Sequence, residues 1–343
     1  MSAERAVDDK LLEVKDLSIS FPTEAGVIRA VNEVSFEVPR RTTVGVVGES
    51  GCGKSVTARA LLNIVQPPGR IDGGQVLFHG DDDAGEPVDL LSMAPKGAAI
   101  RHFRGKRIAM IFQDPMTCLS PVHTVGNQIA ESIRIHDRDV SAGEARERAV
   151  ALLSEVGIPN PAGRLDSYSF ELSGGMRQRA LMAVALAAEP ELLIADEPTT
   201  AIDVTIQAKF LDLIGRLQHE RHMSILFITH DLGVIAEISR VVVVMYLGRV
   251  VEVGRVEEIY ERPLHPYTQL LFRSIPNEHV PRKTPLAQIK GVVPDPFSRP
   301  PGCPFSDRCP SFVQGTCDTA VPPLYEVEEE HHARCFLYDE AAG

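Results

Sequence analysis

The chain has 343 residues, of which 47 are acidic and 35 basic, and its formal net charge at pH 7 is −12. This surplus of acidic residues argues against a general nucleic-acid-binding surface, which needs clustered basic side chains. Apolar runs such as 180–188 and 241–247 are much shorter than the roughly 20 residues of a membrane-spanning helix. Residues 1–5 lack the apolar region of a signal peptide. We therefore expect a soluble protein of roughly two or three structural units, which meets a membrane only through partners.

The first 80 residues predict mostly strands. Apolar residues alternate along 11–21 and 27–38, which is typical of antiparallel strands, and 73–78 predicts a further strand. The acidic segment 80–87 predicts a solvated loop whose role the sequence does not reveal.

A glycine-rich segment follows the apolar run 44–47, which predicts a buried strand. Residues 48–55, Gly-Glu-Ser-Gly-Cys-Gly-Lys-Ser, match G-x-x-x-x-G-K-[ST]. The small residues let backbone N–H groups point at phosphate oxygens, and the helix starting near Lys54 adds the positive end of its dipole. We expect Lys54 to neutralise the β- and γ-phosphates of a nucleotide and Ser55 to hold Mg²⁺. A glycine-rich turn with a chance Lys-Ser pair is the alternative.

Two carboxylates end another apolar run. Residues 192–195 are Leu-Leu-Ile-Ala, and Asp196 and Glu197 follow them directly. A buried parallel strand delivers such side chains to the carboxyl edge of a sheet, where ligands bind. We expect Asp196 to reach Mg²⁺ and Glu197 to act as the base for an attacking water. The alternative is a pair of N-cap residues before the next helix.

The middle of the chain predicts helices. Residues 120–170 have helical periodicity, for example in 145–156, which ends at Gly157. Residues 171–179, Glu-Leu-Ser-Gly-Gly-Met-Arg-Gln-Arg, predict a Ser-Gly-Gly turn that opens an amphipathic helix. Such a helix N-terminus can face anionic charge, although a plain turn before a helix is also consistent. His230 ends the apolar strand 225–229, and strands return over 241–253.

In this order the motifs resemble those of the ATP-binding cassette family, for which the Ser-Gly-Gly signature is the most diagnostic sequence. The resemblance implies an α/β P-loop NTPase fold with a RecA-like core sheet, an antiparallel β subdomain and a helical subdomain at about 116–180. It also implies that Ser173, Gly174 and Gly175 contact ATP held by a partner subunit, since the family completes each ATP site across a dimer interface.

The remaining cassette residues match one by one. Gln113 resembles the glutamine that touches Mg²⁺ or water and the transmembrane partner, Asp203 resembles the D-loop aspartate, and His230 resembles the histidine that bonds the γ-phosphate. The resemblance makes Glu197, His230 and Gln113 the catalytic set, and Ser55, Gln113 and Asp196 the Mg²⁺ set. The residues that it implies for nucleotide binding are Phe21, Gly48, Ser50, Gly51, Cys52, Gly53, Lys54, Ser55, Val56, Gln113, Ser173, Gly174, Gly175, Asp196 and Asp203.

Two of these positions have a second interpretation. Phe21 sits where the family stacks an aromatic ring on adenine, but its alternation with Leu17 and Ile19 equally suits the core face of a strand. Cys52 is expected to act only as a small residue. We also consider the hypothesis that the helix N-terminus lowers its pKa and invites oxidation.

The C-terminal residues narrow the resemblance. Segments 262–268 and 274–276, Gly-Cys-Pro-Phe at 302–305, and Arg308-Cys309 look like the C-terminal extension of oligopeptide and dipeptide importer ATPases. The methionine at position 176 of the signature resembles the residue found there in the D-type ATPase subunit of these importers. We therefore expect an ATPase domain at 10–260 and an extension at 261–343.

Four of the six cysteines lie in this extension: Cys303, Cys309, Cys317 and Cys335. A reducing cytosol disfavours disulfides, so a metal explains them better. Zinc sites usually have close C-x2-C pairs, whereas loosely spaced thiolates suit an iron–sulfur cluster, with which this extension is associated in some family members. A [4Fe–4S] cluster, Zn²⁺ and unligated thiols stay open, in that order of preference. His331 and His332, close to Cys335 in sequence, are expected at the surface.

The resemblance implies an ATP-hydrolysing subunit that powers import of di- or oligopeptides. It implies a heterodimer with a second ATPase subunit, two transmembrane permease subunits and an external binding protein, at the cytoplasmic face of the cell membrane and without nucleic acid. Relatives also carry nickel, glutathione or sugars. The alternative classes are a soluble cassette ATPase of ribosomes or DNA repair, which usually has two cassettes or a coiled-coil insertion, and a regulatory module whose tail cluster senses redox state.

Overall fold

The computed structural model describes residues 10–80, 86–113, 118–199, 203–274, 289, 291–292, 294–295, 297 and 299–339. Most of the acidic loop expected at 80–87 therefore lies outside the described residues, as does Ile202 beside Asp203. Within the described ranges, no helix combines the length and the apolar character that crossing a bilayer requires.

An eight-stranded sheet forms the centre of the fold, in the order β11-β12-β10-β9-β3-β8-β7-β6. Its parallel strands are β3 (Thr43–Val47), β6 (Ile108–Ile111), β7 (Leu192–Asp196), β8 (Ser224–Ile228) and β9 (Val241–Tyr246). All residues of β3, β7 and β8 are buried. Successive residues, such as Ile194 and Ala195, belong to two different core clusters. Both faces of the sheet are thus covered, which explains the uninterrupted apolar runs in the sequence.

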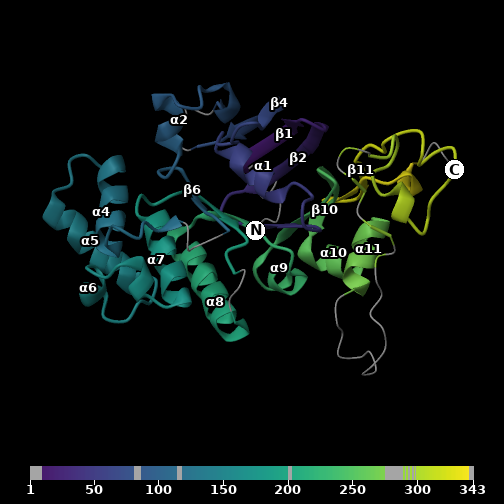
Figure 1. Ribbon diagram of the computed structural model, residues 1–343. Coiled ribbons are helices and arrows are strands. Elements are labelled where there is room, and N and C mark those ends of the chain that lie inside the picture. Colours follow the sequence, from purple (N-terminus) through teal and green to yellow (C-terminus); the bar gives the residue numbers. More distant parts are fainter. Residues whose placement is uncertain are drawn as a thin grey trace.

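A second, antiparallel sheet lies over one face of the first (Figure 1). Its order is β2-β1-β4-β5, with β1 at Lys10–Thr23, β2 at Gly26–Pro39, β4 at Arg70–Phe78 and β5 at Val88–Asp89. Helices α1 (Lys54–Leu61) and α2 (Ala98–Phe103) contribute residues to the same core cluster as this sheet. The alternating segments 11–21 and 27–38 pair as predicted, with Val14 opposite Phe36.

The helical subdomain packs at the β6–β7 end of the molecule, far from the C-terminal extension (Figure 1). It contains α4 (Val125–His136), α5 (Ala142–Glu155), α6 (Pro161–Arg164) and α7 (Gly174–Leu186), and α8 (Val204–Arg221) follows it. Ser141 caps α5 by accepting the backbone N–H of Glu144 at 3.2 Å, and Gly157 after its end has a φ angle of +74°. The stop predicted at Gly157 is therefore confirmed.

The C-terminal extension continues the central sheet. After β9 come β10 (Arg249–Arg255), α10 (Val256–Glu261), α11 (Pro266–Arg273), β11 (Tyr325–Glu328) and β12 (His331–Ala333), while α9 (Leu232–Ile238) precedes β9. Strand β12 pairs antiparallel with β10, and Glu252 lies opposite Ala333. The extension therefore covers the edge of the sheet that β10 would otherwise expose.

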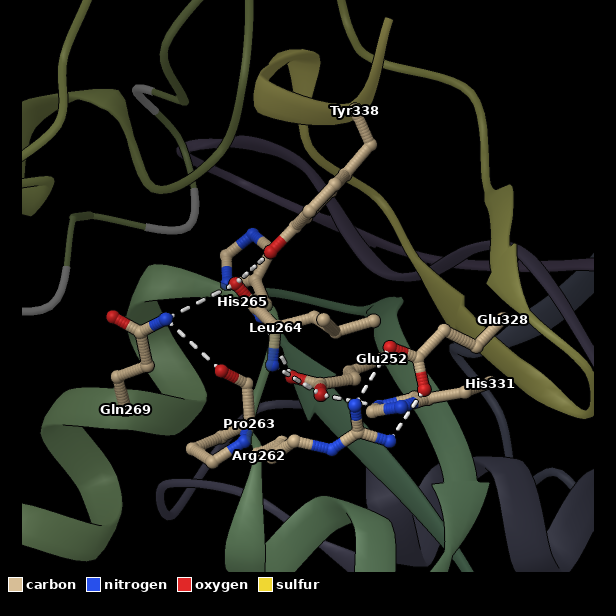
Figure 2. A network of polar contacts seen from close by, with 9 residues as sticks. All are labelled: Glu252, Arg262, Pro263, Leu264, His265, Gln269, Glu328, His331 and Tyr338. Carbon is tan, nitrogen blue, oxygen red and sulfur yellow. Dashed lines mark hydrogen bonds and ion pairs between the residues drawn. The ribbon is translucent and has the colours of Figure 1, made fainter.

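A buried carboxylate fastens the extension to this edge. Figure 2 shows Glu252, which is 0% exposed and accepts the backbone N–H groups of Leu264 at 2.7 Å and His265 at 2.9 Å. His331 Nε2 lies 2.9 Å from the same carboxylate. His331 is itself 0% exposed, so the expectation of a surface residue there is wrong. The carboxylate provides the polar partner that a buried imidazole needs.

His265 belongs to the same region and stays neutral. Burial lowers its pKa to about 4. Its Nδ1 accepts the backbone N–H of Tyr267 at 3.0 Å, so the ring caps the start of α11. A neutral ring is required for this acceptor role.

Replacing Glu252 by alanine should lower the free energy of unfolding by about 3–5 kcal/mol, because three buried donors lose their acceptor. The matched control is Arg262→Ala, which breaks an exposed Arg262–Glu328 pair in the same network and should cost less than about 1 kcal/mol. Urea titrations followed by circular dichroism measure both. Equal costs would contradict the role assigned to Glu252.

Candidate functional site

Residues 48–53 form the loop between β3 and α1. Gly48 and Gly53 have φ angles of +154° and +104°. A Cβ atom at Gly48 would lie 2.2 Å from the carbonyl oxygen of Met245, and one at Gly53 would lie 2.5 Å from that of Ala30. Only glycine fits at either position, so the motif glycines let the loop pass close to neighbouring backbone.

Lys54 is buried beneath this loop. Its ammonium group donates hydrogen bonds to the carbonyl oxygens of Gly48 at 2.8 Å and Glu49 at 3.2 Å. A cation held beside a glycine-rich loop at the N-terminus of a helix forms a site for a phosphate. Of the other predicted loop residues, Ser50 and Gly51 are exposed and Val56 is partly buried.

Helix α1 and strand β7 meet through the two residues expected to hold Mg²⁺. Ser55 Oγ donates to Asp196 Oδ1 at 2.8 Å. Asp196 is 1% exposed, and burial raises the pKa of its carboxyl group while the bond from Ser55 opposes that rise. Neighbouring hydroxyl and carboxylate oxygens are ligands that Mg²⁺ accepts.

Glu197 receives the side chains of Gln113 and His230. Its Oε2 accepts from Gln113 Nε2 at 3.0 Å and lies 3.5 Å from His230 Nδ1. The backbone of Glu197 is left-handed, with φ +46°, and its N–H donates to Ile228 of β8 at 2.9 Å. The structure thus brings together the three residues expected to be catalytic, with Gln113 and His230 at the carboxylate of Glu197. Gln113 bonds Glu197 rather than the Ser55–Asp196 pair.

The signature residues lie at the start of α7. Ser173 is the N-cap, and its Oγ accepts a backbone N–H three residues on at 3.4 Å. Ser173 and Gly174 are exposed, while Gly175 lies so near Ile206 that a Cβ atom would be 3.0 Å from its Cγ2. Asp203 caps α8 by accepting the N–H of Ile206 at 2.9 Å. The turn predicted before this helix is present, and Ser173 and Gly174 at its start are open to solvent.

Phe21 packs as part of β1. It pairs with Ile28 of β2 and is partly buried against the core. A Cβ atom at Gly69 would lie 2.5 Å from its ring. This packing fits the core interpretation, and stacking on adenine stays a prediction.

Cys52 does not have the setting that the oxidation hypothesis needs. Its thiol is 3% exposed, and burial raises its pKa despite the nearby Lys54. Because the thiolate is the reactive form, the hypothesis of a lowered pKa is wrong. The expectation of a small packing residue agrees with its place in the core.

The four cysteines of the extension are neighbours. Burial raises the pKa values of Cys303 and Cys335 to about 11, and interaction with the charges of the other extension thiols adds to both rises. The N–H of Cys303 donates to the carbonyl oxygen of Cys317 at 2.8 Å, and all four thiols are free, Cys309 among them. Among the described residues, no three His, Cys, Asp or Glu side chains are arranged to hold a metal ion.

Two residues that received no role from the sequence, Arg308 and Tyr267, contact Glu49 of the loop. Arg308 of the extension pairs with Glu49, and the hydroxyl of Tyr267 accepts the N–H of Glu49 at 2.9 Å. A carboxylate in a loop expected to bind phosphate is unfavourable alone. That conflict, which had no part in the sequence predictions, could have indicated that Glu49 needs a cationic partner without identifying which one.

Comparison with known proteins decides the family. The model of the ABC transporter family matches residues 31–200, and that of the oligopeptide/dipeptide transporter C-terminal region matches residues 251–317. The chain is 49% identical over 336 residues, or 98% of its length, to 97% of a probable peptide ABC transporter ATP-binding protein of Sinorhizobium fredii. The chain belongs to the ABC transporter family. It is thus an ATPase of the ABC class, with the predicted cassette fold.

Two further comparisons agree with this ABC ATPase. It is 44% identical to the dipeptide transport ATP-binding protein DppD of Escherichia coli, over 97% of this chain and 98% of that protein. A bacterial ABC transporter cassette solved as a dimer superimposes with a TM-score of 0.62 at 22% identity, covering 71% of this chain and 98% of that chain. The second likeness confirms the fold alone.

In the folded ABC ATPase, iodoacetamide should modify Cys52 at least about tenfold more slowly than in urea, because its buried thiol is rarely ionised. Quantitative mass spectrometry of the peptide that contains Cys52 measures both rates at pH 8. Equal rates in the folded and unfolded chain would restore the oxidation hypothesis.

Proposed function

We infer that this ABC ATPase powers the import of di- or oligopeptides as part of a membrane transporter. The observation that carries the proposal is identity along nearly the whole chain to proteins named for peptide transport, together with the match at 251–317. The working unit is a heterodimer with a second ATPase subunit, two permease subunits and an external binding protein, at the cytoplasmic face of the cell membrane. Nickel, glutathione and sugar are the alternative cargoes.

We propose the following division of the chain. Residues 10–260 form the ATPase domain, with the helical subdomain at about 116–180 facing the permeases, and residues 261–343 form the extension. The solvent-exposed start of α7 at Ser173 supports contact with ATP on the partner, because a helix N-terminus favours an anion. Gln113 passes closure of the dimer to the permeases.

Hydrolysis rests on Glu197. Its carboxylate accepts a proton from the attacking water, and Gln113 orients the carboxylate by donating to Oε2 at 3.0 Å. His230, whose Nδ1 lies 3.5 Å from the same oxygen, bonds the γ-phosphate. Lys54 neutralises the phosphates, and Ser55 and Asp196 would hold Mg²⁺, which would supply positive charge to balance the leaving group.

Glu197→Gln should bind ATP with unchanged affinity and lose turnover by at least about a hundredfold, because the amide cannot accept the proton. Turnover is measured in the heterodimer with the partner's catalytic site disabled, so that only this site is counted. Glu147→Gln, a change at an exposed carboxylate of α5 outside the site, is the control. Normal turnover in Glu197→Gln would remove Glu197 from the mechanism.

We also propose that Cys303, Cys309, Cys317 and Cys335 hold a [4Fe–4S] cluster. Four neighbouring free thiols, of which Cys303, Cys309 and Cys335 have raised pKa values, support a ligand that can keep them ionised. The loose spacing of the four cysteines in the sequence favours a cluster over zinc, whose sites usually have close C-x2-C pairs.

Iron, acid-labile sulfide and zinc should be measured in protein purified without oxygen. We expect iron with matching sulfide, and the loss of both in Cys309→Ser. Cys118→Ser, a cysteine outside the extension, is the control and should retain them. Zinc without iron, or no metal in the unmodified chain, would overturn the cluster.

A further inference from the structure

The extension contacts the nucleotide-binding loop through an ion pair. Arg308 Nη1 lies 2.8 Å from Glu49 Oε2, and Nη2 lies 3.0 Å from Oε1, so the guanidinium group holds both carboxylate oxygens. The Arg308 side chain is 5% exposed and that of Glu49 is 24% exposed. A two-pronged, mostly buried pair fixes orientation as well as charge.

Aromatic side chains keep Arg308 in place. Its guanidinium group lies 5.8 Å from the ring centre of Tyr246 and 6.0 Å from that of Phe305, and Nη1 donates to the hydroxyl of Tyr246 at 3.2 Å. Tyr246, Tyr267 and Phe305 pack together with ring centres 4.7–5.5 Å apart. Phe305 comes from the extension, while Tyr246 ends β9 and Tyr267 lies in α11.

The N–H, the carboxylate and the carbonyl oxygen of Glu49 each have a partner. Its N–H donates to Tyr267, its carboxylate binds Arg308, and its carbonyl oxygen accepts from Lys54 Nζ at 3.2 Å. Lys54 is the residue expected to neutralise the phosphates. The position of Arg308 is therefore linked to that of Lys54 through a single residue.

Charge points the same way. Glu49 belongs to the loop that receives a polyanion, and an uncompensated carboxylate there would repel it. The Arg308 guanidinium group cancels that charge at hydrogen-bond distance. Without Arg308 the loop would lose both its restraint and its neutrality.

We propose that Arg308 is a positioning residue for nucleotide binding, through which the C-terminal extension sets the affinity of the loop for ATP. The residue acts through Glu49 and does not touch the nucleotide. The inference depends neither on the transported cargo nor on what the extension cysteines bind.

The test measures the dissociation constant of Mg-ATP for the full chain by calorimetry. Arg308→Ala should weaken binding about tenfold, which corresponds to the loss of one charge-assisted pair. Glu49→Gln alone should weaken it less, because the repelling charge leaves together with the restraint. The double variant Arg308→Ala with Glu49→Gln should recover most of the loss. In the assembled transporter, Arg308→Ala should raise KM and leave kcat within about twofold, since Glu197, Gln113 and His230 are untouched.

Arg262→Ala is the matched control. It breaks a two-pronged pair with Glu328 inside the extension, away from the loop, and should leave the affinity unchanged. If Arg308→Ala does not fold, Arg308→Lys replaces it, with an intermediate loss because one ammonium cannot hold both oxygens. The proposal is overturned if the Arg308 variant binds Mg-ATP normally or if Arg262→Ala weakens binding as much. It is also overturned if the double variant Arg308→Ala with Glu49→Gln binds no more tightly than Arg308→Ala alone.

Discussion

The parallel pairing of β3, β7 and β8 is the constraint on which the site depends. Val46 of β3 and Asp196 of β7 both pair with Ile228 of β8, so the three strands end together. That common edge places Gly48, Glu197 and His230 near one another, although they are far apart in sequence. Because both faces of the sheet are buried, a slip of one residue would exchange the two core faces, and the edge is fixed.

The part of the site that follows from this edge could be predicted from the sequence. An apolar run in the sequence predicts each strand, and the residue after the run carries the polar group, as with Asp196 after 192–195 and His230 after 225–229. Both signals are local. The neighbours Ser55 with Asp196 and Glu197 with His230 then follow from topology alone, and the structure places both pairs in contact.

Partners that form only through tertiary contact could not be predicted. Glu252 and His331 are 79 positions apart, and Glu49 and Arg308 are 259 positions apart. A charged or imidazole side chain is at the surface in most sequences, and only its partner makes burial favourable. Cys52 is a similar case, since the helix start favours its thiolate but burial opposes it and prevails.

The extension is joined to the catalytic core so firmly that the two must change together. Separating them would leave the β10 edge without β12, Glu252 without His331, and Arg308 without Glu49. Each loss exposes or strands a group that is costly alone, above all the buried guanidinium group. A state in which only one of these contacts is broken gains little conformational entropy, because the other contacts still hold the extension. It nevertheless bears the free-energy cost of the group left without a partner. If Arg308 positions the loop as proposed, loosening of the cysteine-bearing segment weakens nucleotide binding, and nucleotide binding stabilises the segment by the same free energy.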